Sequence, residues 1–73
     1  MIQENNINFR IVFGKNVARL REKAKLTREE LSLILGVDNS YVSKLEKGKI
    51  NITIDKIEKI AKYFNINVSV LFE

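Results

Sequence analysis

The sequence predicts an all-α fold, a compact bundle of five helices in a single small domain. Along most of the chain, apolar residues recur at steps of three or four, which is the spacing of one helix face. Polar residues that can cap helix starts precede these stretches, and glycine or asparagine, which end helices, follows them. The 73 residues give room for one domain, and the chain has no proline to interrupt a helix.

The first predicted helix follows a polar, asparagine-rich start. We expect residues 1–7 to form a flexible tail and residues 8–73 to form the domain. From residue 9 onward, five apolar side chains are spaced by four, four, three and four residues, as on one stripe of an amphipathic helix. These inward-facing residues are Phe9, Phe13, Val17, Leu20 and Ala24.

The second helix is predicted to begin at Arg28, because Thr27 and Glu30 form a capping-box pattern. In this motif the threonine hydroxyl accepts a hydrogen bond from a helix-start amide, and the glutamate accepts one from the amide of the cap. Gly36 should end the helix, since glycine readily adopts the left-handed conformation. The residues expected to face inward are Leu31, Ile34 and Leu35.

The third helix is predicted from about Asn39 to Lys47, after a very short turn in which Asp38 is the cap candidate. It buries Val42 and Leu45, which are three residues apart, and it ends at Gly48. Residues 49–52 form a linker to the next helix.

The fourth helix is capped by Thr53 and ends at Asn65, and Asn67 then caps a last short turn over residues 68–72. The inward stripe of the fourth helix is Ile54, Ile57, Ile60, Ala61 and Phe64. Its charged side chains, Lys56, Glu58, Lys59 and Lys62, mix both signs and are expected to face water as bystanders to any site.

The composition excludes most catalytic chemistry. The chain has no cysteine and no histidine, so it lacks a thiolate nucleophile, an imidazole base and the usual soft zinc ligands. We therefore expect no enzyme, cofactor or metal site. The 13 Lys and Arg residues against 9 Asp and Glu give a net charge of +4, which favours an anionic partner. No apolar run is long enough for a signal peptide or a membrane span, so a cytoplasmic protein without a membrane partner is expected.

The second and third helices have the spacing of a helix-turn-helix. Two helices joined by so short a glycine-containing turn cross at a steep angle, the arrangement that places the second helix in the DNA major groove. Apolar residues at both ends of the turn clamp the helices together, Ser32 allows their close approach, and Gly36 permits a positive φ. The clamping residues are Leu31, Leu35, Val37, Val42 and Leu45.

These motifs resemble the lambda-repressor and Cro-like helix-turn-helix proteins, the Xre family, from about Phe9 to Glu73. The resemblance rests on Val17-Ala-Arg-Leu-Arg, Leu26-Thr-Arg-Glu-Glu-Leu31, Gly36-Val37, Tyr41-Val-Ser-Lys-Leu-Glu-Lys-Gly48 and Phe64-Asn-Ile-Asn-Val-Ser-Val-Leu71. It implies a bundle of five helices and a transcriptional regulator that binds palindromic double-stranded DNA as a homodimer. A restriction-modification controller or a phage-type repressor would have this size.

The polar face of the third helix carries the candidate DNA contacts. With its two apolar residues inward, the residues that face outward can donate to or accept from base edges, although a solvated face is the alternative. By resemblance, the base-reading residues are Asn39, Ser40, Ser43 and Lys44, and the phosphate contacts come from Arg28, Tyr41, Lys47, Lys49 and Asn51. Arg28 departs from the glutamine that is common in the family, and its guanidinium should strengthen a phosphate contact. The resemblance also implies that Arg21 and Glu46 form a structural ion pair.

The last turn is more apolar than a small bundle needs for its own core. We therefore expect a symmetric dimer contact there, with core packing as the alternative. The residues of this predicted interface are Ile66, Val68, Val70, Leu71 and Phe72. No small-molecule effector is expected, whereas a contact with a toxin or with RNA polymerase stays open. The alternative function is an antitoxin or another protein-interaction module in which DNA binding is secondary.

Overall fold

The computed structural model describes residues 9–73, and this part of the chain is all-helical. It contains α1 (Phe9–Lys23), α2 (Arg28–Leu35), α3 (Tyr41–Glu46), α4 (Ile54–Phe64) and a short 3₁₀ helix, η1 (Val68–Phe72). The prediction of five helical elements in one bundle is confirmed, with the last turn being 3₁₀ rather than α-helical. The predicted tail at residues 1–7 lies outside the described residues.

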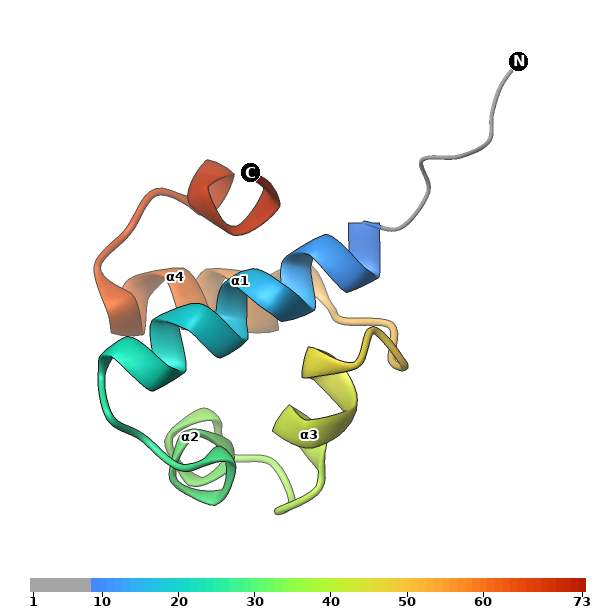
Figure 1. Cartoon of the computed structure of the whole chain (residues 1–73), viewed down its shortest axis with the longest axis vertical. Coiled ribbons are helices and arrows are strands. Elements are labelled where there is room, and N and C mark those ends of the chain that lie inside the picture. Colours follow the sequence, from blue (N-terminus) through green and yellow to red (C-terminus); the bar gives the residue numbers. More distant parts are fainter. Residues whose placement is uncertain (1–8) are drawn as a thin grey trace.

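The helices pack around one apolar core. Figure 1 shows α1 running across the molecule, with α4 behind it, η1 on one side and the α2–α3 pair on the other. The first helix packs against α3 and η1, while α2 contacts both α3 and α4. Every helical element contributes to the buried core, which consists of Phe13, Val17, Leu31, Leu35, Val42, Leu45, Ile60, Ala61 and Leu71.

The helix ends follow the capping signals in the sequence. Thr27 and Glu30 form the predicted capping box, with the Glu30 amide donating to Thr27 Oγ1 at 3.0 Å and the Thr27 amide donating to Glu30 Oε1 at 2.7 Å. Gly36 ends α2 at φ +73°, and Asn65 ends α4 at φ +55°, both in the left-handed region. The hydroxyl of Thr53 and the side chain of Asn67 cap α4 and η1 as expected.

The predicted inward stripes are wrong at the first residues of two helices. Phe9 is 72% exposed and Ile54 is 73% exposed, because each lies in the first turn of its helix, beyond the elements that cover the middle. Ala24 is also exposed, since α1 has already ended at Lys23. The buried face of α1 instead includes Gly14 and the polar residues Asn16 and Arg21.

The third helix is shorter than predicted, Tyr41–Glu46 instead of about Asn39 to Lys47. Asp38 makes a turn before it: Asp38 Oδ1 accepts hydrogen bonds from the amide of Ser40 at 2.9 Å and from its hydroxyl at 2.8 Å. This turn holds Asn39 and Ser40 outside the helix. At the other end the chain leaves the helix at Lys47 and turns through Gly48, which has φ +72°.

Candidate nucleic-acid interface

The α2–α3 pair forms a closely packed helix-turn-helix unit. Ser32 on α2 is fully buried, and its hydroxyl accepts a hydrogen bond from the amide of Val42 on α3 at 3.3 Å. The apolar residues that the spacing placed between the two helices lie in or against the core, which confirms that part of the prediction. Packing against α2 therefore fixes the inner face of α3 and leaves its outer face exposed.

Close contact with α1 fixes α3 from the other direction. A Cβ atom built on Gly14 of α1 would lie 2.5 Å from the carbonyl oxygen of Leu45 and 2.7 Å from that of Glu46. Only glycine allows the two backbones to approach so closely. Contacts with α1 and α2 thus hold α3 rigidly in place, with its outer face exposed.

Three of the four predicted base-reading residues are exposed, and the fourth, Ser43, is partly exposed. Asn39 and Ser40 lie in the turn before α3, and Lys44 projects from its middle. Because the hydroxyl of Ser40 donates to Asp38, it can meet a base edge only as an acceptor in this conformation.

Asp38 brings a carboxylate to this surface that the sequence reasoning treated only as a helix cap. The hydrogen bonds from the hydroxyl and the amide of Ser40 hold its pKa below the ordinary value. A charged aspartate at a fixed position accepts hydrogen bonds from cytosine N4 in protein–DNA complexes. The Asp38-Asn-Ser order before a helix is the local signal for such a turn.

The predicted phosphate contacts surround the same unit. Lys47, Lys49 and Asn51 are exposed, and Tyr41 is partly buried, which raises the pKa of its phenol and keeps it protonated as a donor. Arg10 of α1, which the sequence reasoning did not single out, donates a hydrogen bond to Asn51 Oδ1. This bond links two segments 41 residues apart, so no local pattern indicates it.

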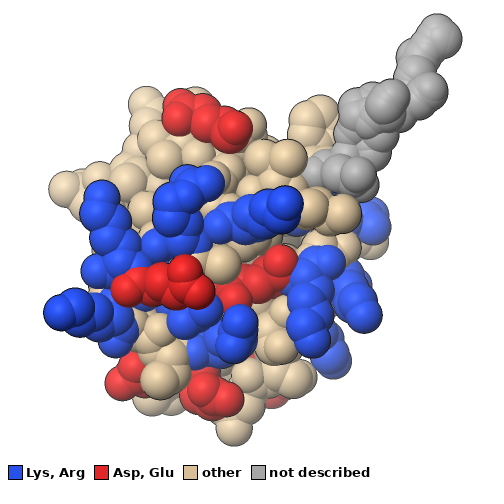
Figure 2. All heavy atoms as spheres, in the orientation of Figure 1, with Lys and Arg blue, Asp and Glu red and all other residues tan. Residues whose placement is uncertain are grey.

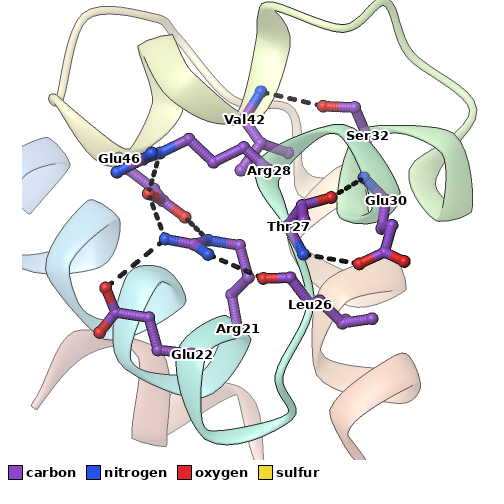
Figure 3. A network of polar contacts seen from close by, with 9 residues as sticks. All are labelled: Arg21, Glu22, Leu26, Thr27, Arg28, Glu30, Ser32, Val42 and Glu46. Atoms are coloured by element: carbon purple, nitrogen blue, oxygen red, sulfur yellow. Dashed lines mark hydrogen bonds and ion pairs between the residues drawn. The ribbon is translucent and has the colours of Figure 1, made fainter.

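Arg21, Glu46 and Arg28 form a connected ion cluster (Figure 3). The expected pair is present, since Arg21 Nε donates to Glu46 Oε2 at 2.6 Å and both side chains are at least nine-tenths buried. Arg28 joins the same carboxylate through Nε, 2.9 Å from Glu46 Oε1, while its side chain stays 51% exposed. The hydrogen bond and charge of Glu46 raise the pKa of Arg21.

Many Lys and Arg side chains lie on the face shown in Figure 2. Lys and Arg side chains gather over α1 and beside α3, with fewer acidic side chains between them. An anionic polymer would be attracted to this side of the domain. The position of the charges, more than the net +4, therefore favours a nucleic-acid surface.

Two lysines of α4, Lys56 and Lys59, differ from their predicted role of facing water. Lys59 Nζ donates to the carbonyl oxygen of Leu35, the last residue of α2, at 3.2 Å. A cation is favourable there because the carbonyls at a helix C-terminus carry partial negative charge. Lys59 is thus a structural contact between α4 and α2, and Lys56 is partly buried rather than fully in water.

The predicted dimer residues divide between the surface and the core. Val68 and Phe72 are 39% and 41% exposed, and Ile66 and Val70 are partly exposed. Leu71 is completely buried in the core of the domain, and its carbonyl accepts a hydrogen bond from Asn16 Nδ2 at 2.8 Å. Leu71 therefore offers no side-chain surface to a second copy, which corrects that part of the prediction.

No three acidic side chains in residues 9–73 lie close enough together to hold a metal ion. None of the described helices has the length and apolar character needed to cross a membrane.

The fold and the exposed face of α3 define a helix-turn-helix DNA-binding protein. Residues 17–71 match the family model described as "Helix-turn-helix". The chain belongs to this family of DNA-binding transcriptional regulators and is of the Xre type.

The relatives include control proteins of similar size. The chain is 35% identical to "Control protein C.MunI" from Mycoplasma sp over 66 residues, which are 89% of each protein. It is 33% identical to "Control protein C.BamHI" from Bacillus amyloliquefaciens over 60 residues, which are 81% of this chain and 74% of that protein. The crystal structure of the restriction-modification controller protein C.AhdI from Aeromonas hydrophila is similar with a TM-score of 0.76 and 34% identity, over 85% of this chain and 90% of that one.

Proposed function

We propose that the protein is a sequence-specific regulator of transcription that binds a palindromic DNA operator as a dimer, in the manner of a restriction-modification controller. The observation that carries this proposal is the outer surface formed by α3 and the turn before it, where Asn39, Ser43 and Lys44 are accessible while the inner face of α3 is fixed to α1 and α2. Asparagine and lysine pair with adenine and guanine in the major groove, and serine pairs with either.

Phosphate contacts would set the position of α3 in the groove. Arg28 stands at the first residue of α2, where the helix-start amides and the guanidinium attract the same anion. Lys47 and Lys49 follow α3 and would contact the backbone on the other side of the groove. Replacing Arg28 with alanine should weaken binding to all duplexes, because phosphates carry no sequence information.

The dimer would form through the surface of α4 and η1. An open groove there is lined by apolar Ala61, Ile66 and Val68, and by Glu58 and Lys62. In a two-fold dimer the same patch of each copy faces the other. Charges of opposite sign within the patch can therefore pair between the two copies. Two α3 helices about 34 Å apart would then match two half-sites one DNA turn apart.

The test compares binding to the DNA upstream of the gene with binding to random duplex at two salt concentrations. Tight binding to the upstream DNA with a steep salt dependence supports a regulator. Equal and weak binding to both duplexes would favour the alternative, a protein-interaction module such as an antitoxin. Sedimentation of the protein as a monomer at tens of micromolar would contradict the dimer.

A further inference from the structure

We infer that Glu46 is a positioning residue for DNA binding: it holds the guanidinium of Arg28 in place to contact a phosphate. This inference rests on the proposed function and assigns Glu46 a role in addition to its ion pair with Arg21. The carboxylate of Glu46 is buried, with only 5% of the side chain exposed, and it is shared by two arginines from different helices (Figure 3).

Arg21 is fully occupied within the domain. Its Nε and Nη2 bond to Glu46, and its Nη1 donates to the carbonyl oxygen of Leu26 at 2.8 Å. With 8% of its side chain exposed, it has no guanidinium edge left for DNA. Arg21 thus anchors the carboxylate, which fixes the point to which Arg28 binds.

Arg28 is bound in a way that leaves its outer edge available. Only Nε contacts Glu46, at 2.9 Å, and within residues 9–73 neither terminal nitrogen has a protein partner. The two terminal nitrogens form one edge of a planar guanidinium, the edge that can bind a phosphate with two parallel hydrogen bonds. The geometry therefore allows Glu46 and a phosphate to bind Arg28 at the same time.

The charges and the side-chain entropy support positioning rather than competition. Glu22 also pairs with Arg21 at 3.6 Å, so the charges of the four residues balance, but Arg28 itself has only a share of the Glu46 carboxylate and its 51% exposed side chain still attracts a phosphate. An arginine that is already held at Nε loses less rotamer freedom when it binds DNA. A lysine at this position keeps the charge, but one ammonium on a flexible stem cannot reproduce the fork geometry.

The test is a double-mutant cycle built on Arg28→Lys, which conserves charge. In the wild-type background we expect about a tenfold loss of affinity for both upstream and random duplex, with the salt dependence unchanged. The second background carries Arg21→Met and Glu46→Leu, which removes the buried pair without changing net charge, and such replacements often preserve stability. There Arg28→Lys should cost less than about twofold. Arg19→Lys, on an exposed arginine of α1, is the matched control and should cost nothing in either background.

A second measurement does not depend on that background folding. The Nε–H group of Arg28 in the free wild-type protein should be as rigid as the backbone by ¹⁵N relaxation, whereas that of Arg19 should be mobile. Equal mobility of the two groups, or equal effects of Arg28→Lys in both backgrounds, would overturn the inference. The cycle can be measured on random duplex even if the protein does not bind the upstream DNA more tightly. Equal binding to the two duplexes would contradict the proposed function and not this inference.

Discussion

The exposed lysines Lys44 of α3 and Lys59 of α4 differ in their contacts with the rest of the domain. On α3, Lys44 projects from a helix whose inner side is fixed by α1 and α2, and no side chain of residues 9–73 bonds to its ammonium. On α4, Lys59 bends back to the end of α2 and bonds to its last carbonyl. Both residues have the same charge and a similar helical context. The comparison shows that a lysine becomes a candidate contact through the rigidity beneath it and the absence of an internal partner.

The largest expected effect is the loss of the support under α3. Gly14→Ala places a methyl group 2.5 Å from a backbone carbonyl of α3, where only a movement of the helices can relieve the clash. Alanine gains about 1 kcal/mol of helix propensity, but overpacking against backbone costs about 3 kcal/mol, so a net loss near 2 kcal/mol is expected. Urea unfolding measures it.

Gly36→Ala is the control for Gly14→Ala. Its Cβ would meet only Lys59 Nζ, at 3.7 Å, so the cost should be the strain of a positive φ, about 1 kcal/mol. If Gly14→Ala were the milder of the two, the close approach of α1 and α3 would not be what holds α3.

The next effect is on DNA affinity, and it compares a lysine on the outer face of α3 with a lysine of α4. Lys44→Ala should cost about 2 kcal/mol on the upstream DNA and little on random duplex, because a base contact carries the specificity. Lys56→Ala removes the same charge from α4 and should leave the ratio of the two affinities unchanged. Titration of both duplexes at one salt concentration gives that ratio. Equal ratios for the two variants would remove Lys44 from the base-reading residues.

A smaller effect is expected for the internal contact of α4. Lys59→Met keeps most of the apolar stem and removes the hydrogen bond to Leu35, so it should lower the free energy of unfolding by about 1 kcal/mol. The ratio of specific to random DNA binding should not change. Lys15→Met, on an exposed lysine of α1 that makes no hydrogen bond within the described residues, should leave stability unaltered. Thermal unfolding of both variants makes the comparison.

How far the sequence predicted this molecule depends on the range of each interaction. The capping box at Thr27, the left-handed Gly36 and the caps of α4 and η1 are set by neighbours within four residues, and they were predicted correctly. The α2–α3 packing was also predictable, because its apolar spacing allows few arrangements.

The errors and omissions arise where distant segments meet. Lys59 contacts Leu35 across 24 residues, and Arg28 contacts Glu46 across 18, so no periodic pattern contains either bond. Leu71 was included in the expected dimer contact because the last turn is more apolar than a small bundle needs, and the sequence does not say which of these residues the core buries. The same limit applies to the exposed first residues of α1 and α4, since periodicity describes a helix face and not what covers its ends.

The smallest expected effect concerns the turn that brings Asn39 and Ser40 to the start of α3. The folded state lowers the pKa of Asp38 from its ordinary value of 3.8 through hydrogen bonds from the Ser40 hydroxyl and amide. A lowered pKa means that the charged carboxylate stabilises the folded form. This stabilisation is fully present above about pH 4 and is lost as the pH falls through the folded-state pKa.

Asp38→Asn should therefore be less stable than the wild type at neutral pH, and the difference should shrink below pH 3.8. Urea unfolding of both proteins at about pH 6 and about pH 2.5 measures the change. Ser40→Ala removes the hydroxyl bond and keeps the amide bond, so it should produce a smaller shift in the same direction. If the difference in stability did not vary with pH, the charge of Asp38 would not contribute to it. The turn before α3 would then depend on the size and hydrogen-bonding groups of the side chain, and not on its charge.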